Sequence, residues 1–499
     1  MLKVVVTSVL AMAGCIALAG PAAALSPDEA RHLLLRTGFG ATPMQIRALE
    51  PMDRAKAVRT ILDSTTTEAV TPPPAFMSEP RPDWPSHYKS TDEETKGVFN
   101  RARDAEAVQL KAWWYTEMIA TPSPFTERMV LFWHNHFTSG MDKVRHTDLL
   151  FRQNALFRQN ATGSFRTLVQ SIAKDPAMVR YLDSQANKKA APNENFAREL
   201  LELYTLGEGR YSERDIREAA RAFTGWHMND ADGQFRFNKG QHDDSTKTVL
   251  GKTGKFDGGD VIDIILSKPE TAVFMTAKLW REFVSDTPDA TEVSRLAKIY
   301  RDSDYDTRKL LEAMFTAPAF WAAENRGALI KSPVELLVGT VRTFEIPIAD
   351  TTPFVEYGKR LRQDIFNPPN VKGWPGGTWW ISTFTLLERR EIVLRLLNGS
   401  DLGAAPGSGG IDGNSMGGGA MGNNGMGGGM SASLAGAKAP AAAPVPGIAL
   451  WVDAHGNLAA APEAAGRLLL ATDPVQPPTG KSGRPMIEAL VLDPAYQVK

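Results

Sequence analysis

The chain has 499 residues, of which 43% are hydrophobic and 23% are charged, and its formal net charge at pH 7 is -1. This is the composition of an ordinary globular protein, and the length permits a sizeable hydrophobic core. The balance of charges gives no indication of a nucleic-acid partner.

The first 24 residues have the pattern of a cleaved export signal. Lys3 precedes an apolar run from Val4 to Ala19, and small residues follow it. We therefore expect this segment to be removed, so that the mature chain starts near Leu25. The alternative is a lipoprotein acylated at Cys15, but the apolar sequence continues beyond that residue.

Cys15 is the only cysteine of the chain. The mature protein would therefore have no disulfide, no thiolate nucleophile and no cysteine ligand for zinc, and an enzyme would have to use oxygen or nitrogen chemistry. No later apolar run approaches the length of a membrane span. We expect a protein that is periplasmic or secreted.

Helical periodicity dominates the chain after the signal. Ser26-Pro27 and Thr42-Pro43 predict two helices between residues 26 and 62, and the pattern predicts one long helix over 93–120. One or two more helices are predicted over 145–180. The predicted fold class is mainly α, a multi-helix globular body.

A further helix starts at Ser123-Pro124 and runs through the segment LFWHNHF, residues 131–137. His136 lies on its apolar face, whereas His134 points away, so the two histidines do not form a helical chelate. His136 is either a buried imidazole bound to a neighbouring polar group, or a proton carrier or metal ligand that meets Glu199.

The most informative segment runs from Asn193 to Trp226 and predicts two helices folded into a hairpin at the centre of the protein. Asn193 or Asn195 can cap the first helix, and Gly207 can end it in the left-handed conformation. Ser212 can cap the second helix.

Glu199 falls between Leu203 and Leu206, inside the apolar arc of the first of these helices. A carboxylate there needs a partner, because burying an unpaired charge is costly. It is either paired with a buried arginine or is a metal ligand or catalytic base. In both cases we expect Glu199 to be the residue whose loss matters most.

A short alternating segment follows the hairpin and predicts a small irregular or β-hairpin region. It leads to His242 and Asp243, which lie in a polar cluster that no apolar face explains. His242 is a candidate ligand or proton carrier, and Asp243 is the candidate group that orients it. Asn193, Asn195 and Trp226 are assigned to a ligand or partner surface.

Amphipathic helices are predicted over 277–283, 289–302, 306–320 and 332–344. The later segment NPPNVKGWPGGTWW, residues 367–380, is irregular because of its prolines and glycines. Its indoles, those of Trp374, Trp379 and Trp380, either pack on the core or are presented to a ligand such as a sugar ring or to a partner.

Residues 399–446 form a low-complexity tract of Gly, Ala, Met and Asn, which we expect to be a disordered insertion. Its methionine thioethers are soft ligands of the kind that bind Cu(I), but their irregular spacing favours a flexible linker. Ordered composition resumes over 447–499, which we assign to the same domain as residues 25–398.

Several segments resemble the signature of one bacterial exported family, catalogued as domain of unknown function 1800. They include NENFARELLELYTLG and YSERDIREAARAFTGW of the hairpin, LFWHNHF, AKLWREFV, IKSPVELLVG and NPPNVKGWPGGTWW. The resemblance covers most of the mature chain and implies no established reaction. Genes of this family commonly lie beside those of an exported family resembling alkaline phosphatases and sulfatases, which implies such a protein as a partner.

Two functions stay open. The first is a hydrolytic, metal-assisted envelope enzyme, with Glu199 as base or ligand, His136 and His242 as ligands or proton carriers, and Asp243 orienting His242. Its cofactor would be a divalent metal. The second is a non-catalytic envelope protein that binds a polymer or a partner protein through the tryptophan-rich loop. No recognised catalytic motif supports the first function.

Overall fold

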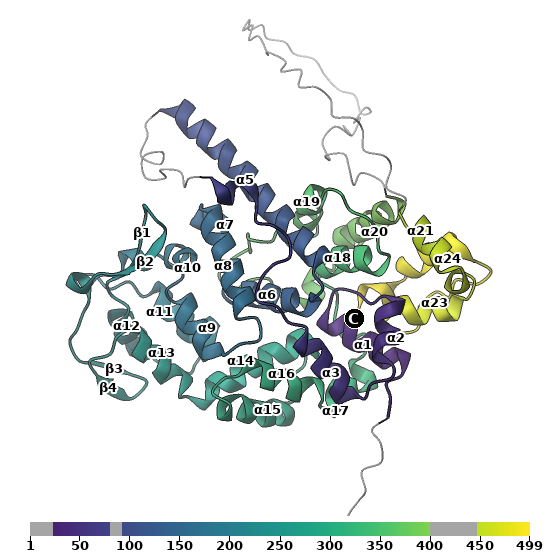
Figure 1. The fold of residues 1–499 in the computed structure, drawn as a ribbon. Helices are drawn as coiled ribbons and strands as arrows, with labels where there is room; N and C mark the ends of the chain where they lie inside the picture. The colour runs from purple at the N-terminus through teal and green to yellow at the C-terminus, as the bar shows by residue number, and fades with distance from the viewer. Residues whose placement is uncertain (1–22, 80–91, 400–446) are drawn as a thin grey trace, which may run out of the picture.

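The computed structural model describes residues 23–79, 92–399 and 447–499. The fold is mainly α-helical, as predicted, and the sheets in these ranges are two antiparallel β-hairpins of two strands each (Figure 1). The predicted export signal, up to residue 22, and the predicted disordered insertion, from 400 to 446, lie outside the described residues.

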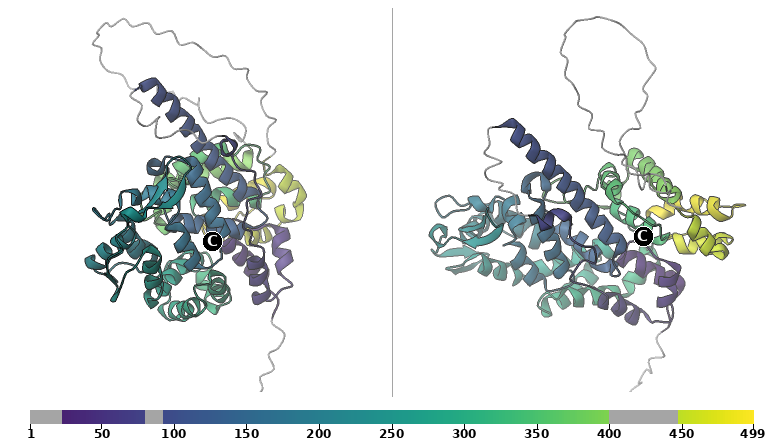
Figure 2. Two further views of the ribbon diagram at one scale, coloured as in Figure 1. Left: turned by 60° about the vertical axis from the view of Figure 1, so that its left-hand side comes forward. Right: turned by 45° about the horizontal axis from the view of Figure 1, so that its top comes forward.

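The N-terminal part of the body is a set of helices that start mostly at the predicted caps. They are α1 (Pro27–Thr37), α2 (Pro43–Leu49), α3 (Arg54–Asp63), the 3-10 turn η1 (Ala75–Ser78), α5 (Glu93–Ala120), α6 (Pro124–His136), α7 (Met141–Val144), α8 (Thr147–Gln159), α9 (Phe165–Ile172) and α10 (Pro176–Tyr181). Helix α5 has the predicted bounds, and its first half projects from the body (Figure 2).

The number of helices was underestimated in two places. Residues 26–62 form three helices where two were predicted, because Asp53 caps a further helix by accepting a hydrogen bond from the Lys56 backbone N–H at 2.7 Å. Residues 145–180 likewise form three helices, since the Asp175 side chain accepts from the Met178 N–H at 2.9 Å and starts α10.

The predicted hairpin is present. A 3-10 turn, η2 (Ser184–Ala186), leads into α11 (Asn195–Glu199), which continues as a π-helix, η3 (Leu200–Thr205), and is followed by α12 (Glu213–Ala222). Gly207 ends the first part with φ +87°, and Ser212 caps α12, as predicted. Strands β1 (Trp226–Asn229) and β2 (Gln234–Phe237) pair with Trp226 opposite Phe237, and β3 (Lys247–Val249) pairs with β4 (Lys252–Gly254) after the turn η4 (Lys239–Gln241).

The C-terminal half adds a second group of helices and turns. They are α13 (Gly258–Leu266), α14 (Pro269–Phe283), α15 (Ala290–Asp302), α16 (Thr307–Phe315), α17 (Pro318–Trp321), η5 (Ala323–Asn325), α18 (Pro333–Thr343), α19 (Thr352–Arg360), η6 (Gly377–Trp380), α20 (Thr383–Asn398), α21 (Ala449–Ala454), α22 (Gly456–Ala459), α23 (Pro462–Leu469), α24 (Gly483–Val491) and η7 (Pro494–Gln497). Helix α14 starts earlier than predicted because Pro269 is at its first turn, and Pro318 divides the helix predicted over 306–320.

Helix α6 is enclosed by other elements. All its residues except Pro124 and Asn135 are buried, and it packs against α1, α5 and α8. Its polar side chains therefore need internal partners: Glu127 accepts two hydrogen bonds from Arg158, at 2.6 and 2.9 Å. Functional groups on α6 are held in a rigid environment.

The segment after residue 446 joins the same body. The backbone N–H of Ile448 donates to the Leu397 carbonyl at 3.0 Å, which places the first residues after the tract beside the end of α20. Helix α23 packs against α1, and α24 packs against α20. The last residue, Lys499, exchanges backbone hydrogen bonds with Leu329.

Candidate functional site

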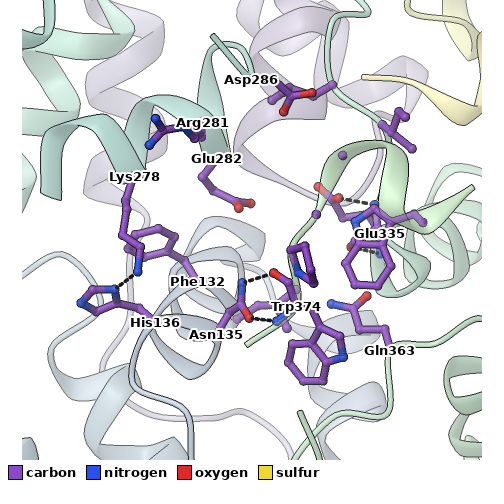
Figure 3. A pocket seen from close by; sticks show the side chains of 18 of the residues that line it. Phe132, Asn135, His136, Lys278, Arg281, Glu282, Asp286, Glu335, Gln363 and Trp374 are labelled. Carbon is purple, nitrogen blue, oxygen red and sulfur yellow. Dashed lines mark hydrogen bonds between the residues drawn. The ribbon is translucent and has the colours of Figure 1, made fainter. Parts of the chain in front are cut away.

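A cavity of about 310 Å³ opens where α6, α14, the start of α18 and the tryptophan-rich loop meet (Figure 3). It is lined by Arg128, Leu131, Phe132, Asn135, His136, Lys278, Arg281, Glu282, Asp286, Leu329, Ile330, Ser332, Glu335, Gln363, Lys372, Trp374, Pro375, Gly376, Gly377, Trp380 and Lys499. Segments that are far apart in the sequence therefore share one concave, charged surface.

Asn135 fastens the tryptophan-rich loop to α6. Its Oδ1 accepts from the Trp374 backbone N–H at 2.7 Å, and its Nδ2 donates to the Trp374 carbonyl at 3.2 Å. Gly373 has φ +76°, and a Cβ at this position would lie 2.2 Å from Asn135 Oδ1, so the contact requires glycine. The loop is thus held without regular structure.

The indoles of the loop pack inward. Trp374 and Trp380 are each 4% exposed and contribute to the cavity wall, while Trp379 is half-buried. The sequence left open whether the indoles pack on the core or face a ligand. Trp374 and Trp380 do both, since they are buried and also line the cavity.

His136 is buried, as predicted, and both of its ring nitrogens have protein partners. Its Nε2 lies 3.1 Å from the Tyr204 carbonyl and its Nδ1 lies 2.9 Å from Lys278 Nζ. Because a carbonyl only accepts, Nε2 carries the proton and Nδ1 accepts from Lys278. Burial and the Lys278 charge hold the pKa of His136 well below its usual range, so the ring is neutral and has no nitrogen left for a metal.

The π-helix η3 explains how these contacts arise. The Leu206 N–H binds the carbonyl of Leu201, five residues earlier, at 3.0 Å. The carbonyls at the end of such a helix lack an internal partner. Those of Leu203 and Tyr204 accept instead from Lys278, at 3.2 Å, and from His136.

Lys278 is the most unusual charge of the cavity. Its ammonium donates to His136 Nδ1 and to the Leu203 carbonyl, and it forms no ion pair among the described residues. Burial, assisted by the nearby Arg281, lowers the pKa of Lys278 to about 8.

The opposite wall is a neutralised charge cluster. Glu335 accepts hydrogen bonds from Arg128, from Lys499 and, at 2.7 Å, from the Ser332 backbone N–H. Burial raises the pKa of Glu335, but the two cations outweigh it and lower that pKa to about 2. Arg128 also pairs with Glu282 of α14 at 2.5 Å, so both of these carboxylates have a cationic partner.

Glu199 is not part of the cavity. It is half-buried and has no hydrogen-bonding or ion-pairing partner in the described parts of the chain. Burial and the neighbouring Glu202 raise the pKa of Glu199. The expected buried arginine partner is absent there, because Arg198 pairs with Glu194 at 3.1 Å and with Glu213 at 2.9 Å.

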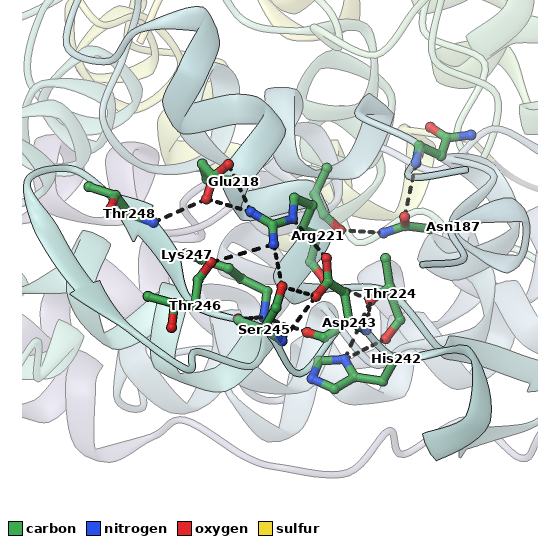
Figure 4. A network of polar contacts seen from close by, with 12 residues as sticks. Asn187, Glu218, Arg221, Thr224, His242, Asp243, Ser245, Thr246, Lys247 and Thr248 are labelled. Carbon is green, nitrogen blue, oxygen red and sulfur yellow. Dashed lines mark hydrogen bonds and ion pairs between the residues drawn. The ribbon is translucent and has the colours of Figure 1, made fainter. Parts of the chain in front are cut away.

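His242 and Asp243 belong to a separate network that fixes the β3 region on α12 (Figure 4). His242 Nδ1 lies 3.0 Å from the Thr224 carbonyl. Asp243 accepts from Arg221 Nε at 2.7 Å and from the Ser245 N–H at 3.0 Å, so it does not orient His242. Burial raises the pKa of Asp243, but these partners lower it well below its usual range.

The remaining predicted residues have structural contacts. The Asn193 side chain accepts from the Asn195 N–H at 2.9 Å, and the Asn195 residue is exposed. Trp226 is buried and packs edge-on against Phe223 and Phe235, at centroid distances of 5.1 and 5.3 Å. Asn193, Asn195 and Trp226 do not line the cavity that contains Trp374 and Trp380.

His134 is also buried, which corrects the expectation that it points away from the core. Because α6 is enclosed, its second face is interior too, and His134 Nε2 accepts from the Phe366 N–H at 3.1 Å. The structure therefore does not bring His136, Glu199 and His242 together. Within the described ranges, no group of three His, Cys, Asp or Glu side chains is placed to hold a metal ion.

The sequence reasoning missed the polar residues of the cavity, above all Lys278, Arg281 and Glu282. A signal was present: the spacing i, i+3 and i+4 in KLWRE places these three side chains on one helical face. No comparable local signal links them to Glu335 or to the loop.

Among the described residues, none of the helices combines the length and the apolar character that crossing a membrane requires. No curated protein and no solved structure matches the chain. The family model described as "Protein of unknown function (DUF1800)" matches residues 32–498, nearly the whole chain. The chain therefore belongs to this family, DUF1800.

Proposed function

We propose that the cavity between α6, α14 and the tryptophan-rich loop binds a small anionic ligand carrying a carboxylate, phosphate or sulfate group. The observation that carries this proposal is the environment of Lys278. The Lys278 ammonium is half-buried in the cavity wall without a carboxylate partner, which is costly, and a bound anion would reduce that cost.

The hydrogen-bond count at Lys278 supports the proposal. An ammonium group has three N–H donors. Two of them reach His136 Nδ1 and the Leu203 carbonyl, both neutral acceptors, and the third has no acceptor among the described residues. Lys278 lines the cavity, so a ligand oxygen there can accept the third hydrogen bond.

Arg281 provides a second cation at the same end. It lies one turn after Lys278 on α14, lines the cavity and forms no ion pair within the described ranges. Two acids of the cavity, Glu282 and Glu335, are already paired with Arg128, and the third, Asp286, is exposed. A planar guanidinium next to an ammonium suits the two-oxygen face of an acid group.

The size of the cavity limits the ligand. Its volume, about 310 Å³, is at the lower end of the range for small-molecule sites, which is about 300 to 1,000 Å³. The indole walls of Trp374 and Trp380 would cover the apolar part of the ligand. A small organic acid or an acidic sugar fits a cavity of this size and lining better than a polymer chain does.

This proposal favours the binding function over metal-assisted hydrolysis, for which the three predicted ligands are not assembled. Export through the first 24 residues and cooperation with a phosphatase- or sulfatase-like exported protein are parts of the same proposal. An exported binding protein could pass a phosphate- or sulfate-bearing ligand to such a partner. N-terminal sequencing of the protein recovered from the periplasm tests the export, with a start near Leu25 expected.

The test of binding is isothermal titration calorimetry with inorganic phosphate, sulfate and pyruvate. We expect at least one of them to bind, and Lys278→Met to weaken that binding about 10- to 100-fold, the effect of losing a charged hydrogen bond worth about 1.5 to 3 kcal/mol. Lys298→Met removes the charge of an exposed lysine on α15 and is the matched control. If none of the three anions binds, or if both variants bind equally well, the proposal is wrong.

A further inference from the structure

The two acceptors at Lys278 satisfy a neutral amine completely. A neutral amine has two N–H bonds and one lone pair, and the described residues offer Nζ two acceptors, His136 Nδ1 at 2.9 Å and the Leu203 carbonyl at 3.2 Å. With both N–H bonds engaged, the tetrahedral geometry of nitrogen directs the lone pair away from both acceptors. Because Lys278 lines the cavity, such a lone pair is available to a bound molecule.

We propose that Lys278 forms an imine with the carbonyl group of a small 2-oxo acid bound in this cavity. The inference rests on the proposed anion site, because Arg281 would hold the carboxylate while Nζ reaches the adjacent carbonyl carbon. Arg281 and Lys278 are three residues apart on one face of α14. In a 2-oxo acid the acid group is directly beside the electrophilic carbonyl carbon, which matches a guanidinium directly beside an amine.

The reaction balances without another reactant. The Nζ lone pair forms a bond to the carbonyl carbon, and the carbonyl oxygen takes up a proton, which gives a carbinolamine. The hydroxyl group then leaves as water after receiving a second proton, while nitrogen loses its remaining protons to base and the carbon–nitrogen double bond forms. Amine and carbonyl compound are thus converted to imine and water.

The surroundings favour the reactive form of the amine. Burial and the Arg281 charge lower the pKa of Lys278 to about 8, so a substantial fraction is neutral in mildly alkaline solution. Desolvation and a neighbouring cation are the two means by which imine-forming lysines are activated.

Glu282 is placed to move the protons. It lies four residues after Lys278, on the same face of α14, and lines the cavity. Its Oε1 is bound by Arg128 at 2.5 Å, and no described residue is hydrogen-bonded to its Oε2. Glu282 can therefore exchange protons with the carbinolamine without losing its place in the charge cluster.

The experiment is reductive trapping. The full-length protein is incubated with pyruvate and sodium cyanoborohydride at pH 8, and the labelled lysine is identified by peptide mass spectrometry. We expect pyruvate to label Lys278 about tenfold faster than methyl pyruvate does. Methyl pyruvate keeps the ketone but lacks the negative charge that Arg281 would bind. Labelling of surface lysines such as Lys298 at the same rate as Lys278, or no labelling of Lys278, would overturn the inference.

Two variants separate this inference from the anion site. Lys278→Arg keeps the charge but cannot form an imine, so it should retain anion binding and lose trapping. Arg281→Gln should slow trapping by pyruvate more than trapping by methyl pyruvate, because both reactions lose the effect of Arg281 on the pKa of Lys278 but only pyruvate loses a partner for its carboxylate. If the wild-type protein binds anions but is not trapped, the imine is wrong and the anion site stands; if it does neither, both are wrong. The wild-type labelling pattern decides the question even if a variant does not fold.

Discussion

The Nζ atom of Lys278 lies 2.9 Å from Nδ1 of His136. This contact joins α14 to the enclosed helix α6 and gives the imidazole a fixed role as acceptor. It also gives the histidine a reason for being buried that requires no metal: the ring positions the lysine and holds it in the cavity wall.

Buried neutral histidines should make the protein sensitive to mild acid. Burial lowers the pKa of His134 to about 3, and burial with the nearby Arg36 lowers that of His32 to about 3. Unfolded histidines bind protons near pH 6.5. The unfolded state therefore binds more protons below this pH, and the free energy of unfolding falls by about 1.4 kcal/mol per pH unit for each such residue.

The measurement is urea unfolding of the wild type and of His134→Gln at pH 7.5 and pH 5.0. We expect the loss of stability between these two pH values to be about 2 kcal/mol smaller in the variant, because one proton-linked group is removed. The comparison of two pH values corrects for any constant effect of the substitution. An equal loss in both proteins would contradict a neutral His134.

Glu335 should be a carboxylate on which stability depends strongly. Replacing it with Gln leaves Arg128 and Lys499 buried without their shared partner, and breaking a buried ion pair in this way costs about 3 to 5 kcal/mol. Glu292→Gln is the control, since it breaks only an exposed pair with Arg295 and should cost no more than about 1 kcal/mol. Chemical denaturation of both variants measures the difference, and equal stabilities would refute it.

Glu199, in contrast, should tolerate substitution. Burial and Glu202 raise its pKa in the folded protein, so the native state binds more protons than the unfolded state and its stability falls as pH rises past the pKa of the unfolded group. The charge thus costs stability at pH 7, and Glu199→Gln should melt at the same or a slightly higher temperature. A loss above about 2 kcal/mol would reveal a partner and restore the sequence-based expectation.

Glu202→Gln is the comparison for this experiment. Glu202 accepts a hydrogen bond from the Tyr211 hydroxyl at 2.7 Å, and a glutamine oxygen can still accept it. We expect this variant to stay within about 1 kcal/mol of the wild type. Thermal unfolding of the two variants side by side distinguishes an effect of Glu199 from a general effect on the hairpin.

Deletion of residues 400–446 should leave the body intact. A Cβ placed on Gly447 would lie 3.0 Å from the backbone nitrogen of Gly399, so the residues on either side of the tract are adjacent. A short glycine linker can join them, and for such a linker each halving of its length reduces the entropic cost of closure by about 0.6 kcal/mol. We expect equal or higher stability and unchanged anion binding; a poorly folded deletion variant would show that the tract supports the fold.

Much of the fold was accessible from local sequence. The bounds of α5, the start of α6 and the cap at Ser212 follow from periodicity and from residues within one turn. The enclosed position of α6 was not accessible in this way, because it depends on what packs against its second face. The same limit explains why His134 was expected to point away from the core.

The candidate site was predicted only in part. His136, Trp374 and Trp380 line the cavity, but Trp379, Glu199 and His242 do not. A helical wheel gives the face of a residue and not its distance from other elements. The cavity is assembled from segments between Arg128 and Lys499, which only tertiary packing brings together. Lys278 was not predicted as a site residue, because a single lysine on an amphipathic helix usually faces solvent and its partners cannot be read from the sequence.

The π-helical turn at the end of η3 connects the hairpin to the cavity through two backbone carbonyls. Both acceptors of the Lys278–His136 pair, the carbonyls of Leu203 and Tyr204, belong to adjacent residues of this single turn. Returning the turn to the 3.6-residue register of an α-helix would rotate both carbonyls together. The winding of η3 therefore fixes the position of the Lys278 amine on α14 and that of the His136 ring on α6 together, through two adjacent carbonyls.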